Sequence, residues 1–235
     1  MVLLGSLVNG LSILAGSIIG KFLHNIPEGI KNAVMHAIGL AVLVLGLQMG
    51  LKSENFLAVV INLVAGVVIG EWMALEDKLN QLGIWIERKI GNHSNRSGSI
   101  SEGFVTATLI FVIGAMGIVG ALDSGIRGNH QVLFTKSILD GFTALILSST
   151  LGMGVLFSAI PVFLYEGLIA LFATQINHFV PKEMIDSFIT EMTSVGGIMI
   201  FAIGLNVLGL TKIKVANFLP SFVVTAILVI FYYFV

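Results

Sequence analysis

Long stretches of this 235-residue chain carry no charged side chain. A helix needs about 20 consecutive apolar residues to cross the hydrocarbon of a bilayer, and most of these stretches reach or approach that length. Only 11% of the residues are charged, whereas a soluble domain has about 25%. The pattern therefore predicts an integral membrane protein. The runs without Asp, Glu, Lys or Arg are 1–20, 37–51, 55–70, 103–122, 141–165, 167–181, 192–211 and 215–235.

Helices are the expected secondary structure of these runs. Lipid offers the backbone no hydrogen-bonding partner, so a spanning segment must satisfy its own amide and carbonyl groups. The alternation of polar and apolar residues that marks a transmembrane β-barrel is missing. We therefore predict an all-α, polytopic bundle of about eight spans, or seven if the sixth does not cross. The predicted helices are 3–23, 33–51, 55–74, 103–122, 136–158, 162–178, 191–211 and 216–235.

The connector 75–102 is predicted to hold an interfacial helix followed by a linker. Apolar residues of its first part recur on one helical face, and two tryptophans lie nearby. This pattern favours a helix lying in the membrane interface, and a solvated helix is the alternative. Residues 91–103 are polar and predict a flexible linker. The residues of the apolar face are Leu75, Leu79, Leu82, Ile86 and Ile90.

Lysine and arginine set the predicted orientation, because cytoplasmic loops carry an excess of them. With eight spans, eight of these residues fall on one side and four on the other, namely Lys52, Arg127, Lys136 and Lys182. We expect the richer side in the cytoplasm and both termini outside, whereas seven spans give seven against five. The first run has no basic segment before it and no cleavage pattern after it, so we expect a retained helix.

Two segments repeat the same order of residues. GLQMGLKSENFL (46–57) and GLNVLGLTKIKVANFL (204–219) both run from a glycine-spaced apolar stretch, across a short basic connector, to Asn-Phe-Leu. The predicted unit is a helix pair, the second and third helices repeated as the seventh and eighth. The matched positions are Gly39 with Gly197, Gly46 with Gly204, Gln48 with Asn206 and, after a shift of four residues, Asn55 with Asn217.

Units five helices apart run in opposite directions, so this alignment predicts an inverted repeat. IPEGI after the first helix and VPKEMI after the sixth extend the match. The predicted organisation is one membrane domain, 1–235, with repeats 1–74 and 161–235 around the connector 75–102 and a central helix pair, 103–160. A rival alignment places 7–20 on 138–152, with Asn9 on Asp140. It pairs the first and fifth helices as parallel repeats and requires that 162–178 does not span.

Asp140 is the sharpest candidate for a binding residue, because polar groups are costly in hydrocarbon and are often functional there. It precedes a 25-residue uncharged run that contains Ser148, Ser149 and Thr150. Three hydroxyls at mid-membrane depth offer oxygen ligands to a cation or hydrogen bonds to a small solute. The alternative is that Asp140 caps its helix at the interface, while the hydroxyls bond their own helix carbonyls.

Five further polar residues lie in predicted helices or at their ends. Gln48 and Asn206 hold equivalent positions and either frame a central site or hold helices together. The same two interpretations apply to Asn9 and Asn62. Glu166 is a proton or cation carboxylate if its helix spans, and a solvated cap otherwise, with the solvated cap slightly favoured.

Glycine patterns predict close helix contacts. Gly16-x-x-x-Gly20 and Gly66-x-x-x-Gly70 mark such faces in the first and third helices. The block GAMGIVGALDSG (114–125) is denser; it allows either tight packing or an unwound backbone that faces a ligand, as in broken transporter helices. Glycine-rich faces also allow a homodimer.

Several functions are not expected. The sequence has no HExxH, GxSxG or Walker motif, so we do not expect an enzyme. The five histidines lack metal-ligand spacing and the chain has no cysteine, so no metal or cofactor is predicted. A net charge of −1 gives no indication of nucleic-acid binding.

The residues NG-x-SILAGSIIG, FVIGAMGIVGALDSGIRG and KSILDGFTALILSSTLGMGVLFSAIPVFLYEG together resemble the YqgA/YdfK family of uncharacterised bacterial inner-membrane proteins. The resemblance covers essentially the whole chain and is most specific over 111–167. It implies a multi-pass protein of the bacterial plasma membrane and provides no assigned activity or catalytic residue.

We expect a transporter or channel for a small ion or solute. The first, fifth and sixth helices would line the path, and Asp140 with Ser148–Thr150 would form the main site. Alternating access would follow if the repeats are inverted. The alternative is a scaffold or regulatory membrane protein whose polar residues only hold helices together.

Overall fold

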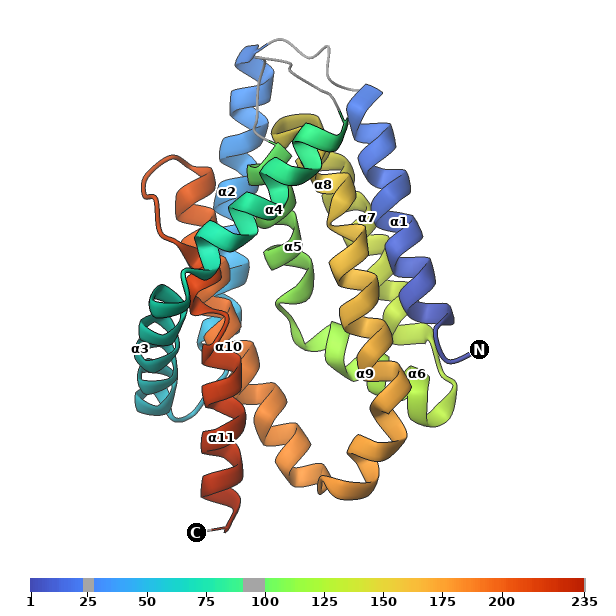
Figure 1. Ribbon diagram of the computed structural model, residues 1–235, viewed down its shortest axis with the longest axis vertical. Coiled ribbons are helices and arrows are strands. Elements are labelled where there is room, and N and C mark those ends of the chain that lie inside the picture. The colour runs from blue at the N-terminus through green and yellow to red at the C-terminus, as the bar shows by residue number, and fades with distance from the viewer. Residues whose placement is uncertain (23–27, 91–99, 235) are drawn as a thin grey trace. The chain divides into compact units, whose positions relative to one another are not determined.

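The protein is described by a computed structural model that covers residues 1–22, 28–90 and 100–234 (Figure 1). Every regular element in these ranges is helical, so the predicted all-α fold is confirmed. The elements are α1 (Leu4–Phe22), α2 (Glu28–Gly50), α3 (Phe56–Met73), α4 (Leu75–Ile90), α5 (Ile100–Val112), α6 (Ala115–Arg127), α7 (Gln131–Leu151), α8 (Gly154–Phe157), α9 (Ala159–Phe179), α10 (Lys182–Val207), the 3₁₀ turn η2 (Val215–Phe218) and α11 (Ser221–Phe234).

The number of spans is close to the predicted eight. Among the described residues, six helices are long and apolar enough to cross a membrane, or seven if the bent pair α5–α6 counts as one span. The apolar part of α2, Met35–Gly50, is shorter than a full span. The sixth predicted helix is α9, which together with α8 forms a 26-residue candidate span, Gly154–Phe179.

The fourth predicted helix is broken, where the sequence predicted one continuous helix over 103–122. The axes of α5 and α6 differ by 61°. Gly114 lies at the break with φ +154°, a conformation that residues with a Cβ rarely adopt. The glycine block 114–125 therefore begins with an interrupted backbone. Gly120 and Gly125 in the same block pack tightly against neighbouring helices, so the tight packing is confirmed, and a ligand-facing role for the interrupted backbone stays a prediction.

The fifth predicted helix begins earlier than expected. α7 starts at Gln131, after His130, and not at residue 136. Lys136 is therefore a buried helix residue and not a flanking charge, so the predicted bias of Lys and Arg becomes eight against three. In the predicted linker, 91–99 lies outside the described residues and 100–103 is already helical.

The chain folds into two compact units. The first contains α1, α5, α6, α7, α8, α9 and most of α4. The second contains α2, α3, α10, η2 and α11. These compact units do not coincide with the predicted repeats. Each predicted repeat has its first helix, α1 or α9, in the first unit and its following helix pair in the second. The predicted repeat boundaries therefore stay predictions.

In the first unit, α1 packs in parallel along α7 (Figure 1). Going along α1, Gly5 meets Leu133, Gly16 meets Gly141 and Gly20 meets Leu145. α9 runs antiparallel to α1, because Gly10 lies against Phe163 and Leu3 lies against Gly167. The contact predicted for Gly16-x-x-x-Gly20 is therefore confirmed, and it lies within the chain; a homodimer stays a prediction.

Substitution of Gly16 by leucine is expected to lower the free energy of unfolding by about 1–3 kcal/mol, the usual range for overpacking. A Cβ at this position would overlap the Gly141 carbonyl, and the backbone cannot move aside as a flexible side chain would. Thermal unfolding of the purified protein measures the effect. Gly29→Ala is the control, since nothing lies within 4 Å of a Cβ built there. Equal stability of Gly16→Leu and wild type would contradict the described α1–α7 packing.

In the second unit, α2 packs antiparallel against α10. Gly46 abuts the backbone of Phe201, and Gly204 abuts Leu43. The repeat alignment places Gly46 on Gly204 and Leu43 on Phe201. Replacing each residue by its counterpart therefore turns one contact into the other, as a two-fold axis between inverted units would.

A second pair of contacts follows the same rule. Gly39 lies against Leu208, and Gly197 lies against Gly50. The alignment matches Gly39 with Gly197 and Gly50 with Leu208. The contacts agree with the inverted alignment, but a straight antiparallel helix pair has a local two-fold relation of this kind in any case, so the internal repeat stays a prediction.

The two Asn-Phe-Leu motifs begin adjacent helices with different capping contacts. The side chain of Asn55 accepts a hydrogen bond from the Ala58 amide at the start of α3. The side chain of Asn217, in η2, accepts one from the Glu76 amide at the start of α4 at 2.8 Å and donates to Glu71. α3 and α11 run antiparallel, and Gly66 and Gly70 pack against Ser221 and Asn217, as that glycine pattern predicted.

The predicted interfacial helix is α4. Its apolar residues Leu82 and Trp85 are exposed, while Gly83 packs against Ser101 at the start of α5. Exposed apolar side chains beside solvated charges suit the membrane interface. The interfacial placement of α4 itself stays a prediction.

Candidate functional site

Four polar side chains meet inside the first unit, and we call them the ionic cluster: Asn9 on α1, Lys136 and Asp140 on α7, and Glu166 on α9. Asn9 and Glu166 have 0% exposure, Lys136 has 6% and Asp140 has 9%. α1, α7 and α9 are the first, fifth and sixth predicted helices, the three expected to line a path. The structure therefore brings together polar residues from all three.

Asn9 bridges the two carboxylates of the cluster. Its amide nitrogen donates to Asp140 Oδ2 at 3.0 Å and to Glu166 Oε1 at 2.8 Å. Lys136 Nζ donates to Asp140 Oδ2 and lies 3.4 Å from Glu166 Oε1. Lys136 and Asp140 are one helical turn apart on α7, a spacing at which opposite charges face each other.

The break after α5 provides another partner for the lysine. Phe111 is the next-to-last residue of α5, so its carbonyl is one of the last four, which have no partner within the helix. Lys136 Nζ donates to this carbonyl at 3.0 Å. After the break, α6 approaches the cluster through Gly117, where a Cβ would lie 3.7 Å from Glu166 Oε1. The interrupted helix thus faces the cluster on both sides of the break.

The ionic cluster has more acceptors than donors. Asn9 Oδ1 and Glu166 Oε2 are buried and have no hydrogen-bond partner. When both carboxylates are ionised, they carry two negative charges against the single positive charge of Lys136. A buried charge without a partner is strongly unfavourable. A proton on Glu166 or a small cation beside it would supply both the missing charge and the missing partner.

The alternative interpretations of Asp140 and Glu166 as helix caps are wrong. Asp140 is the tenth residue of α7, so it cannot cap that helix. Glu166 is the eighth residue of α9 and is fully buried, so it is not a solvated cap. Whether either binds an ion stays a prediction.

The three hydroxyls do not join Asp140. Ser148 lies eight residues further along α7, about 12 Å at the rise of a helix. It donates to the Ser17 carbonyl of α1 at 2.9 Å. Ser149 and Thr150 donate to carbonyls of their own helix, as the alternative interpretation expected. All three hydroxyl protons are therefore used within or between packed helices.

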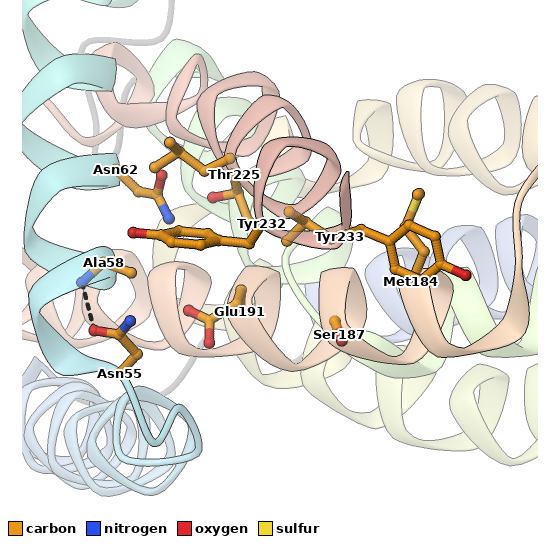
Figure 2. Close-up of a pocket in the computed structure, with 11 residues that line it drawn as sticks. Asn55, Ala58, Asn62, Met184, Ser187, Glu191, Thr225, Tyr232 and Tyr233 are labelled. Atoms are coloured by element: carbon orange, nitrogen blue, oxygen red, sulfur yellow. Dashed lines mark hydrogen bonds between the residues drawn. The ribbon is translucent and has the colours of Figure 1, made fainter. Parts of the chain in front are cut away.

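The predicted amides of the second unit are not a symmetric pair. Asn206 accepts from Ile213 and Thr211 and donates to the Ile213 carbonyl, so it organises the loop after α10. Gln48 is exposed on α2. Asn62 is 1% exposed, and its Oδ1 is buried without a partner. Asn62 lines a cavity of about 250 Å³ in this unit (Figure 2).

Two residues that belong to these sites are missing from the candidates predicted from sequence. The predicted helix boundary makes Lys136 a flanking charge, although its i, i+4 spacing to Asp140 indicates a pair on one helical face. The predicted boundary at 191 likewise makes Glu191 the start of a span. α10 begins at Lys182, so Glu191 lies two and a half turns into that helix and lines the cavity with Asn62. Among the described residues, no group of three or more His, Asp or Glu side chains could hold a metal ion.

Taken together, the apolar helices and the buried ionic cluster define a polytopic helical membrane protein with ionisable groups inside a bundle. The chain belongs to the family described as "Protein of unknown function (DUF554)", whose model matches residues 4–230. The predicted resemblance is thereby confirmed.

Two relatives cover nearly all of the chain. It is 32% identical to "Uncharacterized membrane protein YdfK" of Bacillus subtilis (strain 168) over 230 residues, which is 96% of this chain and 95% of the relative. It is 30% identical to "Uncharacterized protein YqgA" of Escherichia coli (strain K12) over 222 residues, 93% and 92% of the two chains. No solved structure gives a significant match.

Proposed function

We propose that this protein is a transporter or channel for a small cation, with the ionic cluster as its ion site. The observation that carries the proposal is the excess of one carboxylate over Lys136 in a buried site on membrane helices. Ionisable residues inside membrane helices are costly and mark ion pathways and proton relays. The plasma membrane and external termini predicted from the sequence belong to the same proposal.

The chemistry of the site favours a proton or a monovalent cation. Glu166 Oε2 and Asn9 Oδ1 are acceptors without partners, and a proton or cation bound at Glu166 Oε2 would satisfy that oxygen. Lys136 already neutralises one carboxylate, so a single added positive charge balances the site. A divalent ion would find only two carboxylates, one of them bonded to Lys136.

The fold supports a mechanism of alternating access. Broken helices and inverted repeats recur in secondary transporters, where the ion and substrate sites lie beside the interrupted helix. Here α5 ends at a carbonyl that binds Lys136, and the contacts between α2 and α10 follow the inverted alignment. The interrupted helix would therefore respond to the charge state of the cluster.

A non-transporting membrane scaffold is the second candidate. Ser148 and Asn206 favour it, because each uses its hydrogen bonds for packing or for a loop. The ionic cluster favours the transporter, because its two carboxylates outnumber its single lysine and the site is balanced only when it takes up a proton or a cation.

The test is flux of H⁺, Na⁺ or K⁺ into proteoliposomes that contain the purified protein. We expect cation flux with wild type and a fall to the level of empty liposomes with Glu166→Gln, which removes the excess charge and keeps the shape. The folded yield in detergent should be retained, because glutamine preserves an acceptor for Asn9.

Glu183→Gln is the matched control, since Glu183 is exposed in the first turn of α10; its flux should equal that of wild type. Wild-type flux by Glu166→Gln, or no flux of any of the three ions with wild type, would reject the cluster as an ion site and favour the scaffold.

A further inference from the structure

The ammonium group of Lys136 lies among oxygen atoms from three different helices. Its nitrogen donates to the Phe111 carbonyl of α5 at 3.0 Å and to Asp140 Oδ2 of α7. It also lies 3.4 Å from Glu166 Oε1 of α9. An ammonium group has three N–H donors and no acceptor. These three oxygens therefore match its donors in number and hold the nitrogen between them.

Oxygens of this kind bind alkali metal ions in membrane proteins. In broken transporter helices, unwound backbone carbonyls and the C-terminal ends of half-helices coordinate Na⁺, and carboxylates are oxygen ligands for hard cations. Here the end of α5 provides the Phe111 carbonyl, and α7 and α9 each provide a carboxylate oxygen. The point at which a metal ion would meet all three oxygens is taken by the nitrogen of Lys136.

Glu166 keeps one oxygen that neither Lys136 nor Asn9 satisfies. Its Oε1 accepts from the Asn9 amide at 2.8 Å, whereas its Oε2 is buried and has no partner. A metal ion at Oε2 would need a set of oxygens to replace its hydration shell, and it would lie beside the fixed charge of Lys136. A proton forms a covalent O–H bond with the carboxylate and needs no such set. It removes a negative charge without adding a second cation.

The charges around Glu166 decide how many protons the site takes up. Among the described residues, the charged groups that face it are Lys136 and Asp140. One positive and two negative charges become neutral when a single proton is added, so the site takes up one proton. The uncharged groups beside the cluster are Asn9 on α1, the Phe111 carbonyl of α5, Gly117 on α6 and Tyr165 on α9.

We propose that the cation of the ionic cluster is a proton, carried by Glu166 as a neutral carboxylic acid, and that the Lys136 ammonium occupies the position that Na⁺ or K⁺ would take. The inference thus names the ion that the proposed function leaves open. The movement of this proton across the membrane rests on the proposed function, whereas its binding in preference to metal ions does not.

Proton flux tests the identity of the ion. Proteoliposomes in N-methylglucamine chloride contain no Na⁺ or K⁺, and an internal pH-sensitive dye reports H⁺ entry after an external acid step, with tetraphenylborate to balance the charge. We expect wild type to carry H⁺ at a rate that NaCl or KCl at equal concentration leaves unchanged. Glu166→Gln should fall to the level of empty liposomes.

The failures of the two proposals differ in this assay. H⁺ flux that requires Na⁺ or K⁺, or flux of either metal ion alone that Glu166→Gln abolishes, would overturn the proton inference and leave the ion site standing. Absence of flux for every ion would reject the proposed function. The inference about binding is then decided by stability, which needs no transport.

Thermal unfolding in detergent tests the position of the lysine. Wild type should melt at the same temperature in NaCl, KCl and N-methylglucamine chloride of equal concentration. Lys136→Ala vacates the position between the three oxygens, so Na⁺ or K⁺ should raise its melting temperature by roughly 2–4 °C or more relative to N-methylglucamine. Lys52→Ala is the matched control, because Lys52 is exposed, and it should show no dependence on the cation.

Two results of the unfolding experiment would overturn the inference. One is stabilisation of wild type, but not of Glu166→Gln, by Na⁺ or K⁺, which would put a metal ion in the native site. The other is a folded Lys136→Ala protein that neither ion stabilises, because the ammonium would then not occupy a metal position. If Lys136→Ala folds only in NaCl or KCl, the inference is supported; if it folds in no salt, the wild-type comparison decides.

Discussion

Replacement of Lys136 by methionine is expected to lower the free energy of unfolding by about 3–5 kcal/mol, the range seen when one partner of a buried ion pair is removed. Methionine keeps much of the length of the side chain and removes its charge. Asp140 and Glu166 would then share the Asn9 amide with no positive charge nearby. The Phe111 carbonyl would also lose its donor. An average interhelical hydrogen bond in a membrane contributes only about 0.6 kcal/mol, so the charge term dominates.

The double variant Lys136→Met with Asp140→Asn separates charge from packing. It restores the charge balance of that pair and should recover most of the lost stability. Lys52→Met is the control, because Lys52 is exposed after α2 and should change stability little. Thermal unfolding and the yield of monodisperse protein measure all three. If the double variant is no more stable than Lys136→Met, Lys136 stabilises the fold through the packing of its side chain and not through its charge.

The ionic cluster shows where sequence reasoning reaches its limit. Charge-free runs identify membrane helices because hydrophobicity is summed over many residues, but a single charge inside a helix looks like the end of a run. Lys136 therefore resembles a helix boundary in the sequence. Only the fold reveals that Asp140, Glu166 and the end of α5 surround it. The local signal that the sequence does contain is the i, i+4 pair on α7.

The hydroxyl triplet shows a different limit, and its role in binding stays a prediction. Ser148, Ser149 and Thr150 are adjacent in sequence, and each step along a helix turns the side chain by about 100°. Three consecutive residues therefore face different directions and cannot all face one site. Helical spacing would have separated them from Asp140, whereas Asn9 and Asp140 could be joined only by the packing of α1 against α7.

The break between α5 and α6 was only partly predictable. The glycine block 114–125 indicated an unusual backbone, but a charge-free run of 20 residues equally predicts a straight helix. The sequence alignment predicted no contact between α2 and α10, although the two helices pack together through Gly46 and Gly204. Residue identities can suggest a repeat, but they do not say which helices are neighbours.

Cysteine labelling should place residues 52 and 177 on the same side of the membrane. Lys52 follows the second predicted span and Asn177 lies in the last turn of α9, the sixth; both are exposed. An even number of spans precedes each position, so a membrane-impermeant maleimide should label Lys52→Cys and Asn177→Cys in intact cells. Lys212→Cys, one span further, should react only after permeabilisation. The chain has no cysteine of its own, so any label found on the purified variant is at the introduced position.

The helix directions in the first unit restrict how many segments cross the membrane, so the labelling result is decisive. α1 and α7 run parallel, so the segments between them must cross the membrane an odd number of times, as α2, α3 and the bent pair α5–α6 together would. α9 runs antiparallel to α1, so it crosses back. If Lys52→Cys and Asn177→Cys react on opposite sides, one segment between them does not cross. The two sequence repeats would then not be inverted. Alternating access would lose its structural basis, even if the ionic cluster still bound a cation.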